Sequence, residues 1–123
     1  MKRLPLTRLH RLESMRTFNR FRRFLRRTWP TSRPVRIVVK YDHIAIAFEN
    51  GSWGFGAYVP KRDLIYVGGR PPVATTSRKA EMKSVLTTLA HEYYHHVQRC
   101  SGRRYDERTA RRFAVRAVEA FTL

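Results

Sequence analysis

Apolar residues recur every three or four positions along residues 77–100, which is the period of an α-helix with one buried face. The repeating positions are Met82, Val85, Leu86, Leu89, Tyr93 and Val97. A second run of this period extends from about residue 106 to residue 121, with Ala110, Phe113, Ala114, Ala117, Val118 and Phe121 on its apolar face. Gly102 lies between the two runs and is typical of a helix C-terminus. The pattern predicts two helices joined by a short turn.

Residues 35–69 follow a different pattern, with many β-branched residues, partial alternation of apolar and polar positions, and turn residues between the apolar runs. We interpret this segment as three or four antiparallel strands. Residues 70–77 then close the strand region and offer Thr76 or Ser77 as the N-cap of the following helix. Together the patterns predict an α+β fold in which a small antiparallel sheet precedes two helices.

Apolar residues in the N-terminal segment fall at every third position. They are Leu6, Leu9, Leu12, Met15, Phe18, Phe21 and Phe24. Each three-residue step turns about 300° around a helix, so this stripe drifts by about 60° per step. One straight helix could not bury all seven, and we expect the segment to bend or break near Ser14, to be wrapped by a partner, or to be an arm that is largely disordered alone. Two prolines in residues 28–34 predict a linker, which divides the chain into a basic helical arm with its linker, 1–34, and a domain, 35–123.

Charge is distributed unevenly along the chain. There are 26 Lys and Arg residues against 9 Asp and Glu, a formal net charge of +17, and residues 1–36 contain 12 of the basic residues and the single acid Glu13. Such a field favours polyanionic partners, nucleic acid first and an anionic membrane surface second. The three-residue apolar spacing disfavours an interfacial membrane helix, which needs one persistent apolar face. The alternative is that the basic residues form a solvated surface that keeps the protein soluble and binds no partner.

Cys100 is the only cysteine, so no internal disulfide is expected. This predicts the cytoplasm or another reducing compartment, including the virion or the host-cell interior if the protein is viral. No apolar run approaches about 18 residues, so we expect no transmembrane segment. The Arg-rich, acid-poor start keeps a mitochondrial transit peptide open as an alternative. The oligomeric state is not predicted.

His91, Glu92 and His95 form the pattern H-E-x-x-H within the helix predicted at residues 77–100. Two histidines four residues apart lie one helical turn above each other, so both imidazoles can reach one Zn²⁺. The glutamate between them lies beside the ion, where it can take a proton from a bound water. The spacing therefore predicts a hydrolytic zinc site.

The helical wheel separates the histidines of this helix. With Leu89 at 0° and about 100° per residue, His91 and His95 fall near 200° and 240°, opposite the apolar face. His96 falls near 340°, on the apolar face. We therefore predict His91 and His95 as metal ligands and a structural hydrogen bond for His96.

A hydrolytic zinc site usually has three protein ligands, and the third is expected after the motif. Asp106 and Glu107 begin the next predicted helix. The helix at 77–100 extends about 7.5 Å past His95, and a short turn at residues 101–104 would bring the next helix back alongside it. Glu107 then lies at the height of the histidines, whereas Asp106 is better placed as an N-cap and is the alternative ligand.

The stretches LAHEYYHHVQ and ERTARRFA resemble the gluzincin branch of zinc metallopeptidases, and the spacing Glu-x-x-Ala-x-x-Phe-Ala is similar to that of the small ImmA/IrrE-type proteins and minigluzincins. The resemblance covers about residues 77–121 and implies a zincin-like domain. It also implies His91 and His95 as zinc ligands, Glu92 as general base and Glu107 as the third zinc ligand.

The resulting hypothesis is a zinc-dependent metallopeptidase that hydrolyses a protein or peptide substrate, with Glu92 passing a proton from water to the leaving amine. The candidate donors to the oxyanion are Tyr105, Tyr58, Tyr66 and His43, and the sequence does not choose among them. Residues 52–58, SWGFGAY, are the candidate strand for pairing with an extended substrate, and an ordinary hairpin is the alternative.

The basic arm would bring such a peptidase to nucleic acid or to a target bound to nucleic acid. A competing hypothesis assigns the zinc a structural role in a non-catalytic nucleic-acid-binding protein, such as a component of a virion or a ribonucleoprotein.

Overall fold

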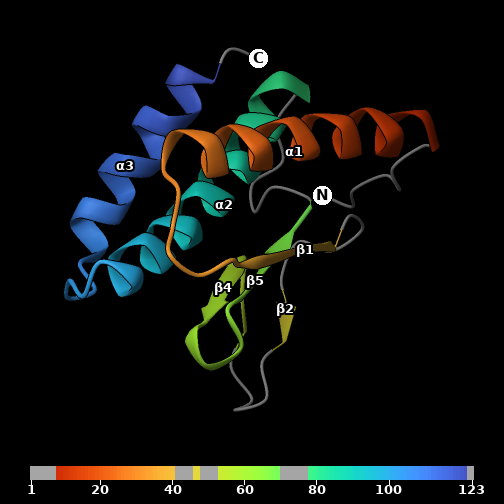
Figure 1. Ribbon diagram of the computed structural model, residues 1–123. Coiled ribbons are helices and arrows are strands. Elements are labelled where there is room, and N and C mark those ends of the chain that lie inside the picture. Colours follow the sequence, from red (N-terminus) through yellow and green to blue (C-terminus); the bar gives the residue numbers. More distant parts are fainter. Residues whose placement is uncertain (1–7, 41–45, 48–52, 70–77, 122–123) are drawn as a thin grey trace.

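The computed structural model describes residues 8–40, 46–47, 53–69 and 78–121. Three helices and a mixed sheet make up the fold (Figure 1), and the predicted α+β class is confirmed. The helices are α1 (Arg8–Thr28), α2 (Arg78–Cys100) and α3 (Glu107–Ala120). The strands are β1 (Arg36–Lys40), β2 (Ile46–Ala47), β3 (Trp53–Gly54), β4 (Gly56–Val59) and β5 (Leu64–Gly68), and the 3-10 turn η1 (Pro60–Arg62) joins β4 to β5.

The main sheet has three strands in the order β1-β5-β4. β4 and β5 form an antiparallel hairpin, but β1 runs parallel to β5, so the prediction of a purely antiparallel sheet is wrong. Ile37 and Val39 of β1 are buried, as the alternating pattern predicts. The same alternation occurs in parallel and antiparallel strands, so it cannot distinguish the two directions of pairing. β2 and β3 form a separate two-stranded antiparallel ladder.

α1 is one continuous helix that shares the core of the fold. Phe18, Phe21 and Leu25 have no solvent exposure and belong to the main hydrophobic cluster. The expected break near Ser14 is absent from this helix, because the buried side chains follow a four- and three-residue spacing and Met15 of the apolar stripe stays exposed. The second half of α1 therefore packs into the core of the fold.

α2 lies at the centre of the fold and contacts β4, β5, α1 and α3. Its predicted apolar face is confirmed, since Val85, Leu86, Leu89 and Tyr93 are buried. The predicted face of α3 is also confirmed, and its buried residues include Ala110, Ala114, Ala117 and Val118. No helix in the described ranges is long and apolar enough to cross a membrane.

Candidate metal centre

The structure brings together the three side chains that were predicted as ligands. His91 and His95 lie one turn apart on α2, and Glu107 is the first residue of α3. The Glu107 carboxylate oxygens lie 2.9 Å from His91 Nε2 and 2.8 Å from His95 Nε2. The two Nε2 atoms are 3.2 Å apart, and all three donors fall within 4.8 Å of one another. The cluster therefore has the size of a single metal site.

The turn between α2 and α3 is what places Glu107 beside the histidines. Gly102 has a φ of +69°, which closes the end of α2 as the sequence predicted. Asp106 then acts as the N-cap of α3: its carboxylate accepts the backbone N–H groups of Arg108 and Thr109. The Thr109 hydroxyl also donates to Asp106, at 2.6 Å. Asp106 is thus engaged at the helix start, and the carboxylate that faces the histidines belongs to Glu107.

Gln98 orients His95 and was missed by the sequence analysis. Its Oε1 lies 3.0 Å from His95 Nδ1, and its Nε2 lies 3.5 Å from the Asp106 carbonyl oxygen. The carbonyl can only accept, so the amide nitrogen faces it and Oε1 faces the imidazole. His95 therefore donates through Nδ1 and keeps the lone pair of Nε2 for the cluster. A polar residue three positions after a ligand on the same helix is the signal that could have found Gln98.

The donor set fits a cation. With Nδ1 of His95 carrying the proton, a neutral His95 presents an acceptor at Nε2 to the acceptor oxygens of Glu107. Acceptors that face one another need a cation or an additional proton between them. Two imidazole nitrogens and one carboxylate are a ligand set that suits zinc.

Burial changes the titration of His91 and Glu92. It lowers the pKa of His91, an effect that the nearby Glu107 opposes, so the imidazole tends toward the neutral form that binds metal. Burial also raises the pKa of Glu92 to about 7, and a hydrogen bond from the Tyr58 backbone acts in the other direction, as would a protonated His95. Glu92 is thus a carboxyl group whose proton affinity is matched to neutral pH.

β4 passes close to Glu92 at Gly56. A Cβ atom on Gly56 would lie 2.7 Å from Thr88 Cγ2 and 3.4 Å from Glu92 Cγ. The first distance is shorter than any normal contact, so only glycine lets β4 approach α2 this closely. Residues 53–54 and 56–58 of the segment predicted to pair with a substrate lie in β3 and β4, and β4 forms one edge of the three-stranded sheet, next to Glu92.

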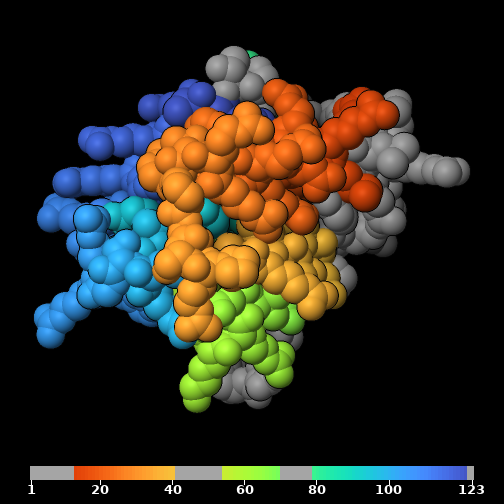
Figure 2. All heavy atoms as spheres, viewed as in Figure 1, coloured from red at the N-terminus to blue at the C-terminus, as the bar shows by residue number. Residues whose placement is uncertain are grey.

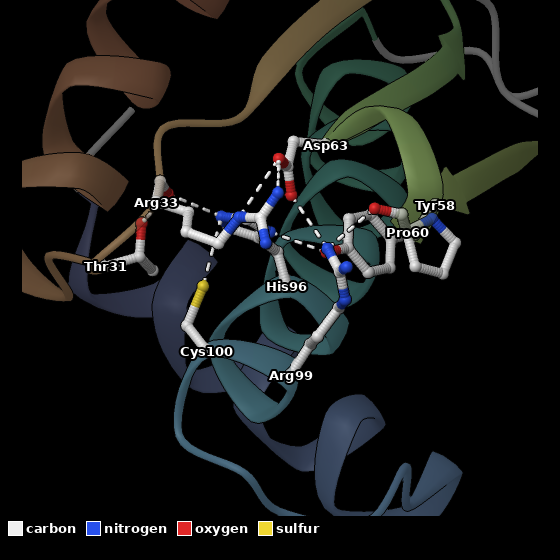
Figure 3. A network of polar contacts seen from close by, with 8 residues as sticks. All are labelled: Thr31, Arg33, Tyr58, Pro60, Asp63, His96, Arg99 and Cys100. Carbon is white, nitrogen blue, oxygen red and sulfur yellow. Dashed lines mark hydrogen bonds and ion pairs between the residues drawn. The ribbon is translucent and has the colours of Figure 1, made fainter.

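His96 has the structural role predicted for it, within a polar network next to the site (Figure 3). It is fully buried, its Nε2 donates to the Arg33 carbonyl at 2.8 Å, and its Nδ1 accepts the Tyr58 hydroxyl at 2.7 Å. Asp63 completes the network by accepting from Arg33 and from Arg99. The network holds β4 and the connection after α1 against the C-terminal half of α2.

Tyr105 is the oxyanion candidate with a contact to the ligands. Its ring centroid lies 5.2 Å from that of His95, and the residue is 52% exposed. Tyr58 is committed to His96, and Tyr66 lies on the central strand β5. His43 lies outside the described residues, as do the predicted N-caps Thr76 and Ser77.

Replacing Gln98 by leucine should weaken the binding of a metal ion such as zinc by about 10- to 100-fold, because His95 loses the acceptor that fixes its orientation. Competition with a chromophoric chelator measures the affinity. Gln98→Glu keeps an oxygen at that position and should stay within a few-fold of the wild type. Equal zinc affinity of the leucine variant and the wild type would refute this role.

Replacing Gly56 by alanine should destabilise the fold by about 1–3 kcal/mol, because the new methyl group collides with Thr88. Urea denaturation measures the loss. Thr88→Ser removes the colliding Cγ2 atom, so the double variant should regain most of the stability relative to Thr88→Ser alone. An undiminished loss in the double variant would show that this contact is not the cause.

Comparison of the chain with protein-family models, with curated proteins and with solved structures gave no match.

Proposed function

We propose that the protein is a zinc-dependent metallopeptidase with a zincin-like domain, in which His91, His95 and Glu107 bind the ion and Glu92 is the general base. The observation that carries this proposal is the convergence of the three donors beside Glu92. The side chain of Glu107 is 61% exposed, so the centre is open to solvent on the α3 side. That opening favours a hydrolytic centre over a closed structural site, which would have four protein ligands.

Zinc bound by these three residues would polarise the scissile carbonyl and lower the pKa of a bound water toward 7. Glu92 would accept one proton as the water oxygen attacks the carbonyl carbon, and would give it to the amine nitrogen as the C–N bond breaks. A carboxyl pKa of about 7 in the metal-free protein allows both transfers, since it makes neither the acceptance nor the release of the proton strongly unfavourable.

The substrate would be an extended polypeptide that pairs with the edge of β4. This strand pairs with β5 on one side, and main-chain pairing on the other side gives affinity with little sequence preference. Tyr105, beside His95, would supply the hydroxyl donor for the oxyanion. Tyr105→Phe should then lower the rate of hydrolysis while leaving zinc bound.

A second candidate function is a non-catalytic nucleic-acid-binding protein that is stabilised by zinc. The net charge of +17 favours a polyanionic partner, and this partner is compatible with either function. The position of Glu92 and the exposure of Glu107 favour the peptidase, since a structural zinc needs neither.

Hydrolysis of an unfolded protein, followed by mass spectrometry of the fragments, tests the proposal. Cleavage should be lost when a chelator removes the metal and should return with one equivalent of zinc. A protein that binds one equivalent of zinc but cleaves no unfolded, extended polypeptide would support the structural alternative.

A further inference from the structure

Four arginines form a straight stripe along the exposed side of α1. Arg16, Arg20, Arg23 and Arg27 are all exposed, and their spacing of four, three and four residues puts them on one face. The opposite face of the helix holds the buried Phe18, Phe21 and Leu25. The arginines therefore project from a helix that is anchored in the core, and the stripe extends over about 16 Å.

α3 carries a second stripe of the same kind. Arg108, Arg112 and Arg116 are exposed and four residues apart, while Ala110 and Ala114 between them are buried. The i, i+4 spacing again places successive guanidinium groups on neighbouring turns of one side.

The end of α3 packs against α1, so the two stripes lie on adjoining elements. Phe121, at the end of α3, packs with its ring centroid 5.0 Å from that of Phe21 and 5.5 Å from that of Phe24 on α1. Arg20 of the α1 stripe lies over the Phe121 ring, at 5.4 Å. In Figure 2, α1 faces the viewer and atoms of α3 are visible beside it at the left edge.

The positive charge of this surface outweighs the negative charge of the acids on the described parts of α1 and α3. Of the acids at the start of α3, Asp106 caps the helix and Glu107 contacts the two histidines. Glu119 is the exposed acid on the outer side of α3. Glu13 is an exposed acid of α1, three residues before Arg16, so seven arginines face solvent beside these two acids.

We infer that the arginine stripes of α1 and α3 form one binding surface for the phosphate backbone of a nucleic-acid duplex. The residues are all Arg, whose planar guanidinium binds phosphate oxygens in pairs. A duplex presents about one negative charge per 1.7 Å of its axis, so both stripes meet several phosphates. Contacts of this kind fix position and carry no sequence information.

A membrane surface fits less well. An interfacial helix must insert an apolar face, and that face of α1 lies in the core. The large apolar side chains that the described parts of α1 and α3 expose are Met15 and Val115. This inference goes beyond the proposed function and does not depend on the metal centre.

Binding of the full chain to a fluorescent 20-base-pair DNA duplex, measured as a function of salt, tests the inference. The stripe variant combines Arg16→Gln, Arg20→Gln, Arg23→Gln and Arg27→Gln. The control variant has the same change in net charge through Lys40→Gln, Lys61→Gln, Lys79→Gln and Lys83→Gln, which alter exposed lysines of β1, η1 and α2. Circular dichroism verifies that both variants fold.

The binding constant K should depend less steeply on salt in the stripe variant. The absolute slope of log K against the logarithm of the salt concentration should decrease by about 3 to 4, since each lost phosphate contact removes about 0.9. Replacing the three arginines of the α3 stripe should lower it by about 2 to 3, and the control variant should change it by less than about 1. A duplex of scrambled sequence should bind equally well.

Three results would overturn the inference: no binding of the duplex, an equal loss of slope in the control variant, or a stripe variant that loses only its binding to vesicles containing phosphatidylserine. Failure of the peptidase proposal would be recognised separately, because the hydrolysis assay contains no duplex.

Discussion

Replacing Glu107 by alanine is expected to leave the protein folded but unable to retain stoichiometric zinc. Glu107 supplies both oxygens that approach the histidines, at 2.9 and 2.8 Å, and two imidazoles alone make an incomplete site. Loss of an outer residue that only orients a ligand weakens metal binding about 10- to 100-fold, so loss of a ligand should weaken it by more than about 100-fold. Metal analysis after gel filtration measures the zinc content per chain.

Two control variants separate the ligand from its surroundings. Glu119→Ala removes another exposed acid of α3 and should retain zinc. Asp106→Ala removes the N-cap, which should cost about 0.5–2 kcal/mol of stability, and should also retain zinc because the Asp106 carboxylate serves the backbone of α3. The assignment fails if Asp106→Ala loses the metal while Glu107→Ala keeps it.

Replacing Glu92 by glutamine should abolish hydrolysis while leaving zinc bound. The Glu92 carboxyl group is not one of the three candidate metal ligands, so the metal content of the variant should match that of the wild type. Loss of the base should lower the turnover by about 10²- to 10⁴-fold, which is the usual contribution of a positioned general base. Initial rates of peptide cleavage at equal zinc content measure the effect. Turnover within a few-fold of the wild type would remove Glu92 from the mechanism.

The same substitution should stabilise the metal-free protein in a pH-dependent way. Burial raises the folded-state pKa of Glu92 from 4.5 to about 7, so the folded wild type holds a proton that the unfolded chain releases between these values. Wild-type stability therefore falls as the pH rises from 4.5 to 7, by at most about 3 kcal/mol, and the glutamine variant lacks this loss. Urea denaturation at pH 4 and pH 8 should show an advantage of the variant that is larger at pH 8. An advantage independent of pH would mean that ionisation of Glu92 is not its source.

The helical period of the apolar residues correctly predicted α2, α3 and the position of Glu107. Apolar residues at three- and four-residue spacing defined α2 and α3 closely, because each helix packs one continuous face against the core. Once both helices and the turn at Gly102 were placed, the position of Glu107 beside His91 and His95 followed from the rise per residue.

The prediction failed where a local pattern has no unique tertiary consequence. Alternation along β1 indicated a strand but could not reveal that it runs parallel to β5. The three-residue apolar spacing suggested that the N-terminal helix breaks near Ser14. Instead, α1 is continuous, packs Phe18, Phe21 and Leu25 into the core and leaves Met15 exposed.

Gln98 was missed for a different reason. Its role depends on two partners, the imidazole of His95 and the carbonyl of Asp106, and these meet only after α3 folds back onto α2. The start of α3 therefore contributes to the candidate site in two ways: its first residue is a ligand, and its N-cap carbonyl positions the side chain that orients another ligand.

The zinc X-ray absorption spectrum of the zinc-loaded wild-type protein tests the central claim most directly. The account predicts one zinc ion per chain, two imidazole nitrogens at about 2.0–2.1 Å, oxygen ligands at about 2.0–2.2 Å and no sulfur. A sulfur ligand at about 2.3 Å, which Cys100 would have to supply, or a closed shell of four protein ligands would contradict it.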